Sequence, residues 1–171
     1  MNRRQFLLAS TGGIVILAGC SNIDTDSGDN SPTSEDENER ITNAEILGLI
    51  SEAHSYITEA SESMDDANVL VGNDQWENAA ESYQDAADSY ADAEVEINTA
   101  INKAEELDDQ EMQDYLGDYQ AYVRAGTSAA TSYTQMCEAM IDGDRDLAQS
   151  HHDQGENYHE DMERYHNQVY D

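Results

Sequence analysis

A heptad pattern of apolar residues runs through the middle of the chain, between residues 76 and 107. Two series of apolar positions recur every seven residues, the second three places after the first: Trp76, Tyr83, Tyr90, Ile97 and Ala104, then Ala79, Ala86, Ala93, Ala100 and Leu107. Most positions between them are Asp, Glu, Asn, Gln or Ser. Because apolar residues at this spacing share one side of an α-helix, the pattern predicts a long helix packed along a single seam.

Three further segments repeat this periodicity, and helix start and stop signals bound each of them. The predicted N-terminal caps, with a Glu three places on in the first three, are Thr42 with Glu45, Asp74 with Glu77, Asp108 with Glu111, and Asp144. Glycines follow two of the predicted helices, as expected for left-handed C-terminal caps: Gly72 and Gly143. The sequence therefore predicts four helices joined by short turns.

Folding each predicted helix back on the one before it pairs residues whose numbers give a constant sum. The first and second helices then meet along an alanine seam, made of these pairs: Ala67 with Ala79, Ala60 with Ala86, and Ala53 with Ala93. The later seams contain large residues, in these pairs: Trp76 with Met140, Tyr83 with Tyr133, Tyr90 with Gly126, Ile97 with Tyr119, Tyr133 with Gly155, and Gly126 with Met162. A tyrosine opposite a glycine is the large-to-small complement that dense packing requires.

These registers predict an all-α protein, an antiparallel up-down-up-down four-helix bundle with long, coiled-coil-like helices over residues 41–171. The alternative is a tetratricopeptide-like solenoid, which the Trp and the Ala/Tyr spacing of the second helix suggest. Its helices would be about half as long and separated by breakers.

The first forty residues lack the helical pattern and predict a delivery segment. Arg3 and Arg4 precede an apolar run over residues 8–17, which is too short to span a bilayer. The run ends in Leu-Ala-Gly before Cys20. The arginine pair resembles a twin-arginine export signal, and the last four residues resemble a lipobox, in which Cys20 is lipidated and becomes the mature N-terminus. An ordinary signal peptide with a chance cysteine is the alternative.

The chain therefore divides into three predicted parts. Residues 1–19 form the lipoprotein signal peptide, and residues 20–40 form a lipid-anchored acidic tether, followed by the bundle. The tether contains one apolar residue, Ile23, and the only proline, Pro32, so it has too little apolar surface to fold by burial and we expect it to be disordered.

The net charge of the chain excludes some classes of binding partner. Lys plus Arg is 7 and Asp plus Glu is 38, for a net charge of −31. Such a surface repels nucleic acid and anionic lipid, so neither is an expected partner. The carboxylates alternate with apolar residues at helical spacing, which favours a folded acidic surface over disorder.

The abundance of carboxylates with a single lysine, Lys103, is similar to proteins of extreme halophiles, in which molar salt shortens the Debye length to about 3 Å. With its export signal, the chain resembles twin-arginine-exported lipoproteins of these organisms. That resemblance implies a place on the extracytoplasmic face of the cell membrane, held by lipid on Cys20.

A candidate metal site lies near the third predicted turn. The register brings Met136 and Cys137 beside His152 and His151. Thioether, thiol and imidazole ligands together suit copper(I). The alternative is that the sulfur side chains fill the core while the histidines lie at its edge.

Other metal motifs fit less well. Two Glu-x-x-His motifs, ending at His159 and His166, have the spacing of ferritin-like di-iron bundles, but both lie on one predicted helix, whereas those bundles use two. Residues 142–153 begin like a calcium loop, yet Leu147 stands where the loop requires Gly, so a solvated, acid-capped turn is preferred. His54 falls on the apolar stripe of the first helix, where we expect a hydrogen-bonded core residue.

No catalytic motif is evident in the sequence. It has no Ser/His/Asp order, no phosphate-binding glycine loop, no haem-attachment motif and no cysteine pairs for zinc. The sequence therefore predicts a protein that is not an enzyme and needs no cofactor. Its expected role is non-catalytic, as a binding, adaptor or spacer protein with a protein partner at the cell surface. The alternative is a copper-handling four-helix bundle.

Overall fold

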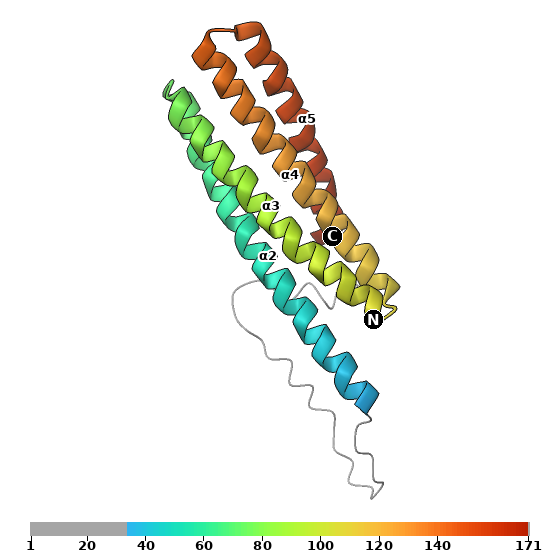
Figure 1. Cartoon of the computed structure of the whole chain (residues 1–171). Helices are drawn as coiled ribbons and strands as arrows, with labels where there is room; N and C mark the ends of the chain where they lie inside the picture. The colour runs from blue at the N-terminus through green and yellow to red at the C-terminus, as the bar shows by residue number, and fades with distance from the viewer. Residues whose placement is uncertain (1–33, 171) are drawn as a thin grey trace, which may run out of the picture.

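The computed structural model describes residues 34–170, so Arg3, Arg4 and Cys20 lie outside the described part of the chain. Four α-helices follow one another: α2 (Ser34–Gly72), α3 (Trp76–Glu106), α4 (Gln110–Asp142) and α5 (Arg145–Tyr170). They run antiparallel in chain order (Figure 1). The predicted all-α, up-down-up-down four-helix bundle is confirmed. Continuous helices of 31 and 33 residues exclude the solenoid alternative, which needs helices about half as long.

The first helix begins earlier than predicted. α2 starts at Ser34 rather than Thr42, so the last part of the predicted tether is helical. The sequence explains the extension, since Ser34 and Glu37 have the spacing of a capping box and the first turn is rich in Asp and Glu. Acidic residues at a helix N-terminus are favoured by the helix dipole.

The predicted seams are present in the structure. All alanines of the α2–α3 seam have no exposed surface: Ala53, Ala60, Ala67, Ala79, Ala86 and Ala93. The rings of Tyr83 and Tyr133 lie 5.2 Å apart between their centroids. A Cβ on Gly126 would lie 2.8 Å from the ring of Tyr90, and one on Gly155 would lie 2.5 Å from the ring of Tyr133. These contacts confirm the registers predicted for α3, α4 and α5.

The three turns share one backbone motif, which differs from the predicted caps. Of the two glycines predicted to be left-handed caps, only Gly143 is one, because Gly72 is the last helical residue of α2. Each helix ends in a residue in the left-handed conformation: Asp74 (φ 58°), Asp108 (φ 54°) and Gly143 (φ 78°). In each, the next amide donates to the carbonyl five residues back, as in Gln75 to Leu70 at 3.0 Å. This is the Schellman motif, which satisfies carbonyls at a helix end.

None of the three predicted capping boxes begins a helix, since Thr42 lies inside α2 and the other two lie at turns. Asp74 lies in the turn after α2 and does not begin α3, whose N-cap Gln75 makes no side-chain capping hydrogen bond. Asp108 ends α3, and its neighbour Asp109 caps α4 by accepting from the amide of Met112 at 3.0 Å. Only Asp144 caps as predicted, accepting from the amide of Leu147 at 3.0 Å. An Asp is suited both to an N-cap and to the left-handed conformation, which explains the error.

The bundle is open on one side. α2 packs along α3, α3 along α4, and α4 along α5, while α2 contacts α4 only marginally. Within the described residues, no comparable contact joins α2 to α5. The two middle helices, α3 and α4, each pack against two neighbours, and α4 buries the larger number of residues.

Candidate functional site

Two buried tyrosines form the centre of the bundle and connect all four helices. Tyr83 on α3 and Tyr133 on α4 are 2% and 7% exposed, and their rings pack against each other. The Tyr83 hydroxyl donates to Asn68 Oδ1 on α2 at 2.7 Å. The Tyr133 hydroxyl donates to Glu156 Oε1 on α5 at 2.7 Å. A line of polar contacts therefore crosses the bundle from α2 to α5.

Both phenols are held in their protonated form. Burial raises the pKa of Tyr83 to about 12, with smaller contributions from Cys137 and Glu156. Burial also raises the pKa of Tyr133 well above its usual range, and the negative charge of Glu156 adds to the shift. The two tyrosines act as hydrogen-bond donors that fix the positions of α2 and α5.

A second aromatic layer lies further along α4. The ring centroids of Tyr119 and Tyr122 are 6.3 Å apart, and those of Tyr122 and His166 on α5 are 6.0 Å apart. Tyr90 on α3 hydrogen-bonds with Ser61 and Tyr122, although burial still raises its pKa. The tyrosines thus have packing partners and hydrogen-bond partners within the bundle.

The four residues of the predicted copper site lie at different depths. Met136 is 7% exposed and Cys137 is fully buried, whereas His151 is half-buried and His152 is exposed. The ring of His152 lies against the edge of Tyr133, with 6.1 Å between centroids. Burial raises the pKa of the Cys137 thiol to about 11, which disfavours the thiolate that binds soft metals.

Metal chemistry receives no positive support from these positions. Among residues 34–170, no three His, Cys, Asp or Glu side chains are placed to hold a metal ion. The His152 ring is directed at an aromatic partner, and the Asp144 carboxylate of the calcium-like segment caps α5. Copper binding stays a prediction from the sequence. The expectation for His54 is wrong, because the side chain is exposed: it lies one position beyond Ala53, which takes the seam position.

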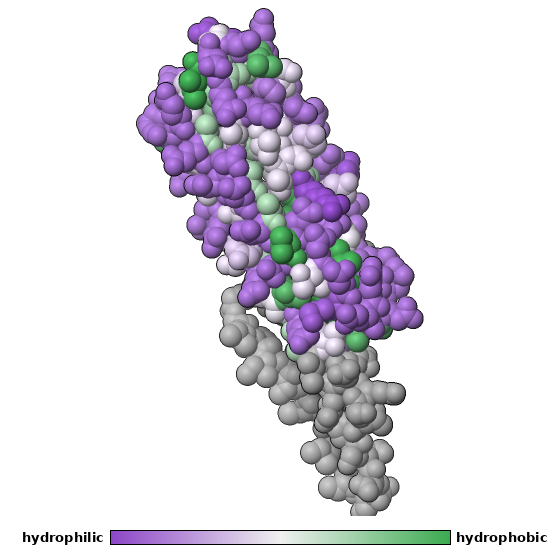
Figure 2. Space-filling view, viewed as in Figure 1, coloured by the Kyte–Doolittle hydropathy of each residue, from purple (hydrophilic) through white to green (hydrophobic). Residues whose placement is uncertain are grey.

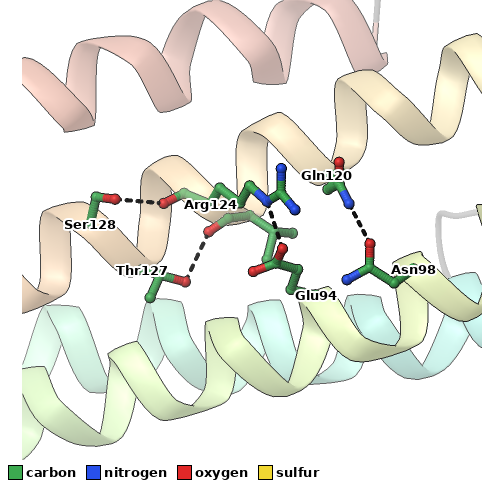
Figure 3. Close-up of polar contacts among 7 residues, drawn as sticks. Glu94, Asn98, Gln120, Arg124, Thr127 and Ser128 are labelled. Atoms are coloured by element: carbon green, nitrogen blue, oxygen red, sulfur yellow. Dashed lines mark hydrogen bonds and ion pairs between the residues drawn. The ribbon is translucent and has the colours of Figure 1, made fainter.

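Polar bridges between α3 and α4 were not predicted from the sequence (Figure 3). Arg124 Nε donates to Glu94 Oε1 at 2.6 Å, and one turn away Gln120 donates to Asn98. The residue numbers of both pairs sum to 218, two more than for Tyr90 with Gly126, so a search for complementary polar residues beside that seam is the signal that finds them. Near the end of α3, Lys103 donates to Glu45 on α2 at 2.6 Å. These bridges fix the alignment of neighbouring helices.

The face of the bundle seen in Figure 2 is predominantly hydrophilic. Within residues 34–170, no helix combines the length and the apolar character needed to cross a membrane. Comparison with protein-family models, with curated proteins and with solved structures finds no match to this chain.

Proposed function

We propose that the protein is a lipid-anchored extracytoplasmic adaptor or spacer, which holds a binding surface away from the membrane without catalysing a reaction. The chain enters the bundle at one end of α2, and α2 ends at the opposite end of the molecule (Figure 1). With 39 residues, α2 extends over about 58 Å at a rise of about 1.5 Å per residue. This separation is the observation that carries the proposal.

The buried polar groups support a structural use of the interior. The hydroxyls of Tyr83 and Tyr133 are occupied by Asn68 and Glu156, which lie on the two outermost helices of the array. Within the described residues, every buried side-chain nitrogen or oxygen has a hydrogen-bond partner. Groups used in this way hold helices in place.

The membrane attachment is tested at Cys20. Replacing Cys20 with Ser removes the thiol that would carry the lipid, so the protein is expected in the medium or in an uncleaved form. Replacing Arg3 and Arg4 with Lys is expected to stop export. Cell fractionation measures both outcomes. A cleaved Cys20→Ser protein that stays firmly on membranes would contradict the lipid anchor.

The adaptor role is tested by photo-crosslinking in intact cells. A photoreactive residue at position 147 lies near the α4–α5 turn, at the end far from the start of α2, whereas one at position 95 lies along the side of α3. Both positions are exposed, so they form a matched pair. We expect a discrete crosslinked product from position 147 only. Equal crosslinking at both positions, or none at either, would contradict an adaptor with its binding surface at the far end.

A further inference from the structure

The far end of the bundle carries exposed apolar side chains. The α2–α3 turn and the α4–α5 turn lie at this end, because successive helices alternate in direction (Figure 1). Three of the five large apolar residues exposed in the described chain are within one helical turn of these two turns: Val69 at 63%, Ile141 at 46% and Leu147 at 46%. The other two, Leu47 and Val95, lie elsewhere along the helices.

Partly buried residues accompany these three. Val71, Trp76 and Met140 pack against the core and keep part of their surface exposed. The confirmed register of α3 and α4 aligns Trp76 with Met140, so the α2–α3 side and the α4–α5 side of this end are neighbours. Figure 2 shows hydrophobic surface at this end, over both pairs of helices. We call these six residues the apolar tip: Val69, Val71, Trp76, Met140, Ile141 and Leu147.

Exposed carboxylates accompany the apolar tip along the chain, and we call them its rim. Within residues 66–77 and 138–147 the only basic residue is Arg145, against these exposed acids: Asp66, Asp74, Glu77, Glu138, Asp142, Asp144 and Asp146. The segment from Asp142 to Asp146 lines a shallow, open depression at the α4–α5 turn. The tip therefore combines exposed apolar side chains with neighbouring negative charge.

The charge of the rim decides what occupies the tip. Nucleic acid and anionic lipid are repelled, and a second copy of the chain would bring two negative rims together. A segment with apolar side chains on one face and Lys or Arg beside them complements both parts of the surface. Resting on the proposed adaptor function, we propose that the apolar tip binds a cationic amphipathic segment of a partner protein.

The apolar tip and the acidic rim contribute differently to binding, and this difference predicts how binding depends on salt. Salt screens the attraction between the rim and basic side chains, while the apolar contact persists. Binding is therefore expected to weaken with salt and then to level off rather than vanish. A purely electrostatic association would continue to weaken until no binding remained.

The test uses a synthetic helical peptide with Leu at positions i, i+3, i+4 and i+7, Lys at the other positions and no aromatic residue. Trp76 is the only tryptophan in the chain and belongs to the tip, so its fluorescence reports binding at this place. The full chain with Cys20→Ser is titrated in dilute and in molar salt. We expect saturable binding with a blue shift of Trp76 emission that is retained in molar salt.

A triple variant, Val69→Ser/Ile141→Ser/Leu147→Ser, is compared with a matched control, Leu47→Ser/Val95→Ser. All five residues are exposed, so both variants are expected to fold, as circular dichroism would verify. The triple variant is expected to bind at least about tenfold more weakly, and the control as tightly as the unaltered chain. If the triple variant fails to fold, Leu147→Lys alone is expected to weaken binding in the same direction.

Several outcomes would overturn the proposal. These are equal affinities of the triple variant and the control, binding without a change in Trp76 emission, no binding in molar salt, or tip-dependent dimers in sedimentation experiments. The last outcome would assign the tip to a second copy. A failure of the tip proposal can be distinguished from a failure of the lipid-anchor proposal. Fractionation of the Cys20→Ser variant measures membrane attachment alone, and the peptide titration measures binding at the tip alone.

Discussion

The two hairpins of the bundle are held together by different kinds of residue. Between α2 and α3 the side chains are small on both sides, as with Ala60 and Ala86, which have no exposed surface. Between α4 and α5 a large ring lies over a residue without a side chain, because Tyr133 packs on Gly155. Both arrangements let the helices approach closely, but only the second places an aromatic ring directly against a glycine of the neighbouring helix.

The difference teaches where the stability and the specificity of the fold reside. An alanine pair buries little apolar area and tolerates neither a larger residue nor a polar one. A buried tyrosine contributes a large contact area and also a hydrogen bond that defines its neighbour, as Tyr133 does with Glu156. We therefore expect the α4–α5 hairpin to respond most strongly to substitution at its aromatic residues.

The largest effect is expected for Tyr133→Ala. Loss of this ring leaves a cavity against Tyr83 and Gly155 and is expected to destabilise the protein by about 3–5 kcal/mol, as for other large-to-small core changes. Tyr133→Phe keeps the ring and loses the bond to Glu156, for about 1–2 kcal/mol. Chemical denaturation measures both. A smaller cost for Tyr133→Ala than for Ala86→Gly in the other hairpin would reverse the comparison.

Glycine substitutions sharpen the comparison within α4 and α5. Gly155→Ala places a methyl group 2.5 Å from the packed ring of Tyr133, so we expect destabilisation by about 1–3 kcal/mol despite the better helix propensity of Ala. Gly117→Ala is the matched control, because nothing lies within 4 Å of its Cβ position. This control is expected to stabilise the helix by up to about 1 kcal/mol. Equal effects of the two changes would show that Tyr133 does not pack on Gly155.

Two buried groups, Tyr83 on α3 and Cys137 on α4, titrate at high pH, whereas the alanines of the α2–α3 seam do not titrate. The pKa of Cys137 rises from 9.0 to about 11 on folding, and that of Tyr83 from 10.0 to about 12. The folded state keeps these protons longer than the unfolded state. The stability from both groups is therefore complete below pH 9 and is lost as pH rises toward about 12.

Denaturation between pH 8 and about 12 would measure this decline. Cys137→Ala removes the group that titrates first, so its stability is expected to begin falling at higher pH than that of the unaltered chain. A decline that starts at the same pH in both proteins would assign it to other groups.

The smallest effects are expected at the turns, where the hairpins differ again. Asp74→Gly and Asp108→Gly each remove a side chain from a left-handed residue and a charge from a helix C-terminus, for a gain of up to about 1 kcal/mol. Gly143→Ala is expected to cost about 1 kcal/mol, since it introduces the strain that the other two turns already contain. Thermal melts resolve these changes. A loss of stability in Asp74→Gly would mean that its carboxylate has a structural role.

The constant-sum register explains why so much of the interior could be predicted. Short turns leave little freedom in how one helix faces the next, so the contacts of Tyr83, Tyr90 and Tyr133 followed from numbering and residue size alone. The polar pairs Glu94–Arg124 and Asn98–Gln120 also share one sum, two larger than that of the apolar seam beside them, so pairing the apolar positions alone does not reveal them.

The conformation of the turns and the separation of α2 from α5 could not be predicted from the register. Asp74 and Asp108 have the same sequence signature whether they end one helix or begin the next, because Asp suits both conformations. The sequence also does not show that α2 and α5 remain apart, since amphipathic stripes specify a buried face but not how many neighbours cover it. The depth of Cys137 relative to His152 depends on that arrangement, so the predicted copper ligands could not be placed by register alone.

The repeated turn geometry also limits how a protein of this kind changes size. An insertion in one helix shifts every later pair unless its neighbour gains the same number of residues, and a number other than seven rotates the seam away from its partner. Growth of the bundle must therefore occur in matched heptads across all four helices, in steps of about 10.5 Å. The distance between the two ends of the molecule is thus a discrete quantity, and variants with intermediate lengths should fail to fold.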